Sequence, residues 1–150
     1  MITEPKWKSL LANTTEPIFT PSQCQDIINA GHQQESKEAR VGHKEGRKGK
    51  YDIKKRITTI SWIPFKAMPD MYRIIERSMK QVNGNHFGYE GMTITENAQF
   101  TEYPKGGFYN WHIDADMNCQ NEPPVRKISM TILLSPQNEF EGGDLEFMTE

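Results

Sequence analysis

The hydrophobic periodicity of this chain changes near Gly91, and this change constrains the fold more than any other feature. Before it, apolar residues recur at helical spacing in two segments; after it, short apolar and polar alternations are separated by turn residues. Two helices followed by short antiparallel strands indicate an α+β domain in which the helices pack on one face of a β-sandwich or jelly roll. The length of 150 residues predicts one such domain, residues 1–150, with no room for two independent cores.

The first helix is predicted to begin after Thr20. Thr20 is a typical N-cap residue, Pro21 fits the first helical position, and Ile27 and Ile28 supply an apolar face. Gly31 is expected to end this helix.

The second helix is predicted within residues 69–85, "PDMYRIIERSMKQVNGN". Asn83-Gly84 is a typical helix end. The apolar residues at helical spacing are expected to lie in the core and not around a cofactor: Met71, Ile74, Ile75, Met79 and Val82.

Short strands are predicted wherever apolar and polar residues alternate. The first is closed by Pro64, since proline cannot donate a hydrogen bond to a neighbouring strand. The glycine pairs 106–107 and 142–143 are expected in turns that need unusual backbone angles, and Asp144 is expected to be structural. The predicted strands are 56–64, 92–103, 108–114, 127–135 and 144–148.

The composition favours a folded domain with a modest core. Leu, Ile, Val and Phe make up 29 of the 150 residues, which is low, but the net charge of −2 is also small. No apolar run is long enough to span a membrane, and the N-terminus does not resemble a signal peptide. We therefore expect a cytoplasmic protein without membrane contact, in which Cys24 and Cys119 are reduced and unpaired.

Residues 37–56 contain nine Lys or Arg and three Asp or Glu, about half of all the basic residues in the chain. A solvated loop explains such a run, and so does a basic flap that guides an anionic substrate or a nucleic acid. Interleaved acids and few aromatic residues weaken the nucleic-acid interpretation.

His112 and Asp114 form an H-x-D pair within "YPKGGFYNWHIDAD", residues 103–116. On a strand, residues two apart point to the same face, so the imidazole and the carboxylate are expected to lie side by side. Such a pair could bind one cation. An H-x-D pair also arises by chance, and a hydrogen-bonded His and Asp without a metal is the alternative.

A longer pattern surrounds this pair: Tyr103-x-x-Gly106-x-x-Tyr109-x-x-His112-x-Asp114, followed by "RKISMTILLS" and "EGGDLEF". It resembles the prolyl 4-hydroxylase-like Fe(II)/2-oxoglutarate dioxygenases, specifically the PKHD-type hydroxylases of bacteria and phages. The upstream segments "IKKRITTISWIP", "NGNHFGYE" and "AQFTEY" follow in the order expected of that group, so the resemblance extends from about Thr20.

The resemblance implies a double-stranded β-helix, or jelly roll, that binds Fe(II) through two histidines and one carboxylate. Three protein ligands on one face of the metal leave positions for 2-oxoglutarate and O2. His112 and Asp114 would be two of these three metal ligands. Ascorbate is a further candidate cofactor, and the expected substrate is a protein, a peptide or a small molecule.

The resemblance also suggests roles for five neighbours of the metal site. Tyr103 would bind 2-oxoglutarate, although it could be an ordinary barrel-lining tyrosine. Thr131 and Leu133 share one face of their predicted strand and could line the same pocket or belong to the core. Tyr109 and Trp111 are candidate substrate contacts, and Trp111 could equally be a core residue.

The pattern departs from the family in one respect. The family places its second histidine, and an Arg or Lys that binds the distal carboxylate of 2-oxoglutarate, on later strands, and no histidine follows His112 here. His32, His43 and His86 precede the predicted strands and match no family ligand. We therefore expect a chain that lacks its C-terminal strands, holds iron weakly and turns over poorly.

Three functions remain open on the sequence. The first is a dioxygenase that hydroxylates a C–H bond, of a prolyl or other residue in a protein or peptide, and releases succinate and CO2. The second is a non-catalytic β-sandwich that binds a partner without a complete metal site. The third, a nucleic-acid demethylase, depends only on the basic run.

Overall fold

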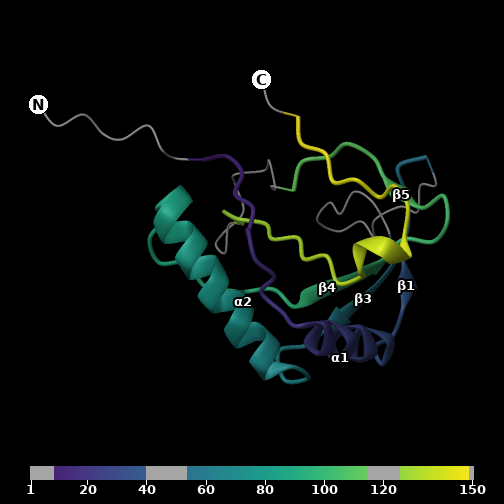
Figure 1. The fold of residues 1–150 in the computed structure, drawn as a ribbon, viewed down its shortest axis with the longest axis horizontal. Coiled ribbons are helices and arrows are strands. Elements are labelled where there is room, and N and C mark those ends of the chain that lie inside the picture. Colours follow the sequence, from purple (N-terminus) through teal and green to yellow (C-terminus); the bar gives the residue numbers. More distant parts are fainter. Residues whose placement is uncertain (1–8, 40–53, 115–125, 149–150) are drawn as a thin grey trace, which may run out of the picture.

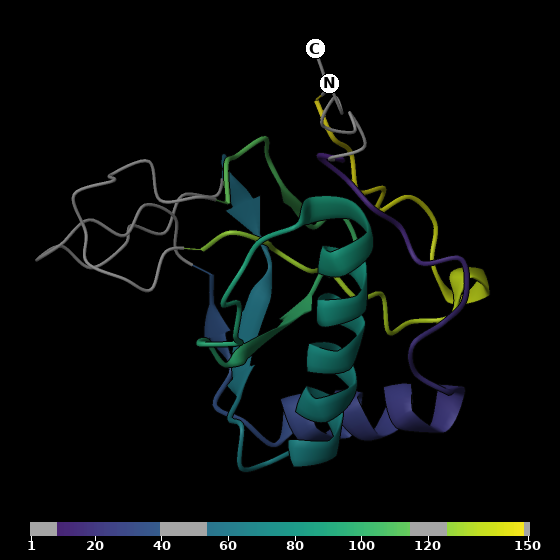
Figure 2. The same ribbon diagram turned by 90° about the vertical axis from the view of Figure 1, so that its left-hand side faces the viewer.

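The computed structural model describes residues 9–39, 54–114 and 126–148. Two helices pack on one face of a small antiparallel sheet, and a short two-stranded ribbon adjoins that sheet, with Thr58 alone between them along the chain (Figures 1 and 2). This arrangement agrees with an α+β class. The jelly roll stays a prediction, and so does the single domain over residues 1–150.

Helix α1, Pro21–His32, begins as its sequence predicts. The Thr20 hydroxyl accepts a hydrogen bond from the Gln23 backbone N–H, and the Gln23 side chain accepts one from the Thr20 N–H. This capping box satisfies two backbone donors that a helix start leaves free. The expectation that Gly31 ends the helix was wrong, because the helix continues through Gly31 to His32.

Gly31 is needed for close packing of α1 on the sheet. A Cβ atom at this position would lie 2.4 Å from the ring of Phe100. The Ser61 hydroxyl also donates a hydrogen bond to the Gly31 carbonyl, at 2.8 Å. The glycine therefore lets the helix backbone approach the sheet directly, a role of glycine that differs from ending a helix.

Helix α2, Pro69–Val82, buries Met71, Tyr72 and Ile75 on one side. The α-helix ends before Asn83 as predicted, but the chain continues as a π-helical turn over Asn83–Phe87, and Gly88 ends it with φ of 71°. No helix in the described part of the chain is both long and apolar enough to cross a bilayer.

The main sheet has the strand order β1-β3-β4. All pairings are antiparallel, and Ser61 of β3 lies opposite Phe100 of β4. The strands are β1, Lys37–Glu38; β3, Thr59–Ile63; and β4, Ala98–Glu102. The predicted strand at 56–64 is thus largely confirmed, but it is interrupted at Thr58, which divides it between two sheets.

The second sheet is a ribbon of β2, Arg56–Ile57, and β5, Phe108–Tyr109. Arg56 lies opposite Tyr109 in the antiparallel register. Directly opposed residues of such a pair project to the same face, so this register brings the two side chains together.

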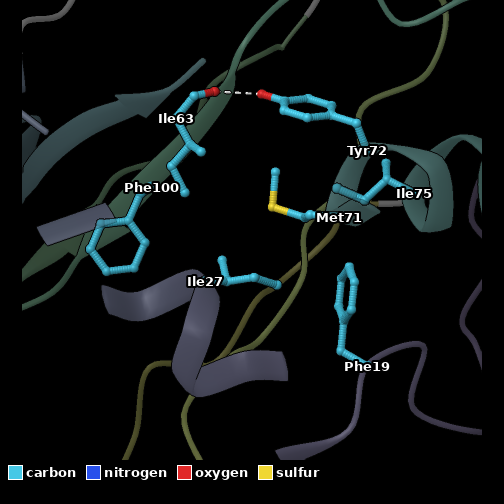
Figure 3. Close-up of a cluster of buried hydrophobic side chains, with 7 residues drawn as sticks. All are labelled: Phe19, Ile27, Ile63, Met71, Tyr72, Ile75 and Phe100. Atoms are coloured by element: carbon cyan, nitrogen blue, oxygen red, sulfur yellow. Dashed lines mark hydrogen bonds between the residues drawn. The ribbon is translucent and has the colours of Figure 1, made fainter. Parts of the chain in front are cut away.

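The core lies between the two helices and the main sheet (Figure 3). Ile63 is its most enclosed side chain, at 1% exposure. The Tyr72 hydroxyl donates to the Ile63 carbonyl at 2.5 Å and accepts from the Ala98 N–H at 2.6 Å. The buried members are Phe19, Ile27, Ile63, Met71, Tyr72, Ile75 and Phe100.

The strands predicted at 127–135 and 144–148 are wrong, since neither segment is a strand in the structure. A strand needs a hydrogen-bonded neighbour, and none of the residues that the structure describes pairs with these segments. Alternate side chains in residues 127–135 are nevertheless partly buried, since Met130, Ile132 and Leu134 pack against the core.

Candidate metal centre

The H-x-D pair lies in an irregular segment that follows β5. Strand β5 ends at Tyr109, and residues 110–114 have neither helical nor strand structure and are exposed. The expectation that a strand presents both side chains was therefore wrong. The two side chains still meet, with His112 Nε2 at 3.1 Å from Asp114 Oδ1.

The other imidazole nitrogen of His112 lies 2.9 Å from the Asn110 carbonyl oxygen. A carbonyl oxygen only accepts, so Nδ1 carries the proton in this contact. In the neutral ring Nε2 is then an acceptor, and it faces a carboxylate oxygen that is also an acceptor. Two acceptors at this distance need a proton or a metal cation between them.

This arrangement fits one side of a ferrous site. A neutral imidazole nitrogen and a carboxylate oxygen are both ligands for Fe(II), and a metal-binding histidine commonly donates its other N–H to a carbonyl. His112 and Asp114 would supply two ligands. Among the described residues, no group of three or more His, Cys, Asp or Glu side chains is placed to hold a metal.

The other described histidines lie elsewhere. His32 Nε2 is 2.8 Å from Glu102 Oε1, and its ring packs edge-on against Phe100. His86 lies in the π-helical turn beside Phe87. His43 lies outside the described residues. That His32 and His86 are not ligands of the H-x-D site stays a prediction.

Tyr109 and Arg56 extend the site behind His112. The Tyr109 and His112 rings stack with centroids 3.6 Å apart and planes 15° apart. The guanidinium carbon of Arg56 lies 4.3 Å from the centroid of the same Tyr109 ring. Tyr109, a candidate substrate contact from the sequence, thus contacts a metal-ligand candidate in the structure.

Arg56 is a residue that the sequence did not single out, because it was counted with the basic run. It is 7% exposed. Its Nε donates to Thr58 Oγ1 at 2.7 Å and its Nη2 to Gln99 Oε1 at 3.1 Å. Its place at the start of an alternating apolar stretch was the only sequence signal that Arg56 would be buried.

Residues 40–53 of the basic run lie outside the described residues, so the loop and flap interpretations stay predictions.

Tyr103 follows β4 directly and is 54% exposed. Loss of water around the phenol raises the pKa of Tyr103 above 10.0, and the nearby charge of Arg56 opposes this rise. The phenol is therefore protonated at neutral pH and can donate a hydrogen bond. Its interaction with a cosubstrate stays a prediction.

Arg126 contacts the backbone of the other metal-ligand candidate. Its Nη1 donates to the Asp114 carbonyl at 2.8 Å. Its Nε and Nη2 donate to the Glu96 carboxylate, which precedes β4. This bidentate pair connects residues 96, 114 and 126, and sequence reasoning missed it because nothing local relates the three positions.

The remaining candidates lie on the surface. Trp111 is 57% exposed and Leu133 63%, and Thr131 is exposed beside it. The core alternative for these three residues is therefore wrong. Whether Thr131 and Leu133 line a cosubstrate pocket, or Trp111 contacts a substrate, stays a prediction.

Comparison with known proteins finds similarity in the segment that contains this site. Residues 98–150 match the model of the 2OG-Fe(II) oxygenase superfamily. A PKHD-type hydroxylase of Stenotrophomonas maltophilia is 45% identical over 49 residues, which is 31% of this chain and 22% of that protein. A PKHD-type hydroxylase of Alteromonas mediterranea is 38% identical over 53 residues, which is 33% of this chain and 24% of that protein.

The matched stretch thus spans less than a quarter of the length of either curated relative. No solved structure matches the chain. The family match includes His112, Asp114 and Arg126, and it begins at the first residue of β4. Residues 98–150 of this chain are thus similar to the 2OG-Fe(II) oxygenase superfamily and, within it, to PKHD-type hydroxylases.

Proposed function

We propose that His112 and Asp114 are two ligands of the iron in a 2-oxoglutarate-dependent dioxygenase. It hydroxylates a C–H bond, of a prolyl or other residue in a protein or peptide, with release of succinate and CO2. The observation that carries this proposal is the 3.1 Å approach of an imidazole nitrogen, His112 Nε2, and a carboxylate oxygen, Asp114 Oδ1. The superfamily match supports Fe(II), 2-oxoglutarate and O2, and the names of the two relatives support hydroxylation.

Bound Fe(II) and 2-oxoglutarate would supply the oxidising power that activates O2 for attack on a C–H bond. The part of this chain is to bind and orient. His112 presents Nε2 because Asn110 holds the proton on Nδ1. Tyr103 supplies a protonated phenol that can donate to a cosubstrate carboxylate, and Thr131 and Leu133 are candidates to line the same pocket.

Trp111 and Ile113 alternate with the metal-ligand candidates and are exposed by 57% and 69%. They are exposed apolar side chains next in sequence to the two proposed iron ligands, and we expect a protein or peptide substrate to contact them. Trp111, with its flat ring, is the stronger of these two substrate candidates.

The test is an anaerobic titration of Fe(II) into the protein with 2-oxoglutarate present, followed through the visible charge-transfer absorption of the complex and, after O2 is admitted, through succinate release. Because the chain is expected to hold iron weakly, we expect absorption from the unmodified chain only at high Fe(II) concentration, and none from His112→Gln or Asp114→Asn. His32→Gln is the matched control, because His32 is engaged with Glu102 and should leave the absorption unchanged. Equal absorption from all four proteins would contradict the proposal.

A non-catalytic binding module is the second candidate, and the exposure of Trp111 and Ile113 favours it as well. Such a module would bind its partner through this surface without metal. The same titration separates the two functions, because a binding module would show no absorption that depends on both Fe(II) and 2-oxoglutarate.

A further inference from the structure

We propose that Tyr109, supported by Arg56, is a positioning residue that holds the His112 imidazole in its metal-binding orientation. This inference rests on the proposed function, since it concerns the same metal site. It assigns to Tyr109 a contact with a ligand in place of a contact with substrate.

The need for such a residue follows from the local backbone. Residues 110–114 belong to no strand or helix and are exposed, so secondary structure does not fix the direction of the His112 side chain. The Nδ1 hydrogen bond to Asn110 restrains one atom of the ring. A ring held at one atom can still turn about that bond, which would move Nε2 away from Asp114.

The Tyr109 ring prevents this rotation because it restrains the plane of the whole imidazole ring. The two ring centroids are 3.6 Å apart and the planes differ by 15°, so the imidazole lies almost flat on the phenol. Turning the imidazole would break this contact over the whole ring face. The hydrogen bond and the stack together leave Nε2 directed at Asp114 Oδ1.

Arg56 fixes Tyr109 in turn. At 3.6 Å the imidazole occupies one face of the phenol, so a guanidinium 4.3 Å from the same centroid must lie on the other face. A cation over an aromatic face is held by the ring quadrupole, and more strongly when water is excluded, as it is around the 7% exposed Arg56. The result is a three-layer stack of Arg56, Tyr109 and His112.

Hydrogen bonds from Arg56 connect the stack to the main sheet. Arg56 is anchored by Thr58 Oγ1, between β2 and β3, and by Gln99 Oε1 on β4. Through these contacts the rigid part of the fold sets the position of an exposed loop residue. Support of this kind around a metal ligand commonly changes metal affinity by about 10- to 100-fold.

The stack can be tested first without any metal. The NMR signals of the His112 ring protons should be shifted upfield by the ring current of Tyr109. We expect the shift to persist in Tyr109→Phe, which keeps the ring, and to disappear in Tyr109→Leu. The His32 signals are the internal control, because His32 packs against Phe100 and should not change in either variant.

The second readout is the affinity for Co(II), used as an air-stable probe for Fe(II), measured from the paramagnetic broadening of backbone amide signals in residues 108–114. We expect Tyr109→Leu to bind Co(II) about 10-fold more weakly than the unmodified chain. Tyr109→Phe should restore the affinity to within about 2-fold, since the stack uses the ring and not the hydroxyl. Arg56→Gln, which leaves Tyr109 in place, should weaken binding by about 3-fold.

These measurements separate failure of the inference from failure of the metal site. If the unmodified chain binds Co(II), His112→Gln does not, and Tyr109→Leu binds as tightly as the unmodified chain, the positioning role is overturned and the metal site stands. If His112→Gln binds as well as the unmodified chain, both are overturned. If Tyr109→Leu does not fold, Arg56→Gln decides, and an unchanged affinity in that variant overturns the inference.

Discussion

The helix-backed core and the segment that carries the H-x-D pair are held in place by different forces. Each core position is fixed by many apolar contacts, as for Ile63 at 1% exposure, between two helices and a sheet (Figure 3). His112 and Asp114 instead lie on an exposed, irregular segment and depend on a few directional contacts: the Asn110 carbonyl, the Tyr109 ring and Arg126.

Each region is therefore sensitive to a different kind of change. A change in the core alters close packing, so it should lower the free energy of unfolding and leave the local geometry of the H-x-D pair intact in the molecules that remain folded. A change around the H-x-D pair removes an exposed contact, so it should cost little stability but alter metal binding.

The largest effect is expected for Gly31→Ala. The new Cβ would lie 2.4 Å from the Phe100 ring, so the helix or the ring must move. Overpacking of this kind costs about 1–3 kcal/mol, and the gain in helix propensity offsets only part of it. Urea unfolding followed by circular dichroism measures the change.

Gly84→Ala is the matched control for this prediction. Gly84 also lies in a helical turn, but a Cβ there would have no atom within 4 Å. We expect its unfolding free energy to stay within about 0.5 kcal/mol of the unmodified chain. Equal changes in both variants would show that close approach at Gly31 is not what matters.

A smaller loss of stability is expected for Tyr72→Phe. Ile63 and Ala98 lie opposite each other in the β3–β4 register, and the Tyr72 hydroxyl bridges the Ile63 carbonyl and the Ala98 N–H. Removing the hydroxyl leaves both backbone groups without this partner, which costs about 1–2 kcal/mol. The same urea unfolding measures it, and an unchanged midpoint would mean that water replaces the hydroxyl at no cost.

The same residue predicts a pH dependence. Burial raises the pKa of Tyr72 above 10.0, and the hydrogen bond from the Ala98 N–H opposes this rise. The unfolded state therefore loses its phenol proton first, so the contribution of Tyr72 to stability is complete below pH 10.0 and is lost as pH rises through the folded-state pKa. We expect a shallower alkaline fall in unfolding free energy for Tyr72→Phe than for the unmodified chain.

Local signals in the sequence predicted the core region well. The N-cap residue Thr20, with Pro21 after it, and the apolar spacing of α2 are short-range features, and both helices begin where these features indicate. Strand β1 was missed because it consists of two exposed charged residues, Lys37 and Glu38, whose strand conformation depends on pairing with β3.

The surroundings of the H-x-D pair were less predictable, because distant positions create them. The spacing of His112 and Asp114 predicted that the two side chains meet, although the strand invoked to explain it is absent. Arg56 was counted with the basic run, for which a solvated loop and a basic flap both stood as interpretations. It is buried because β2 pairs with β5, fifty-odd positions later in the chain. No periodicity within residues 37–56 carries that information.

The smallest effect on stability is expected for the double variant Glu96→Gln with Arg126→Gln. The two side chains form an exposed bidentate pair, and exposed pairs contribute about 0–1 kcal/mol. The double change removes one charge of each sign, so the net charge near the H-x-D pair is conserved. The variant loses the hydrogen bond from Arg126 to the Asp114 carbonyl, so we expect Co(II) to bind about 3-fold more weakly while the urea unfolding midpoint hardly changes.

Lys127→Gln is the control, since Lys127 is exposed and has no contact with Asp114 among the described interactions. A loss of stability without a loss of affinity in the double variant would reverse the contrast between the two regions, because the H-x-D segment would then be part of the cooperative core.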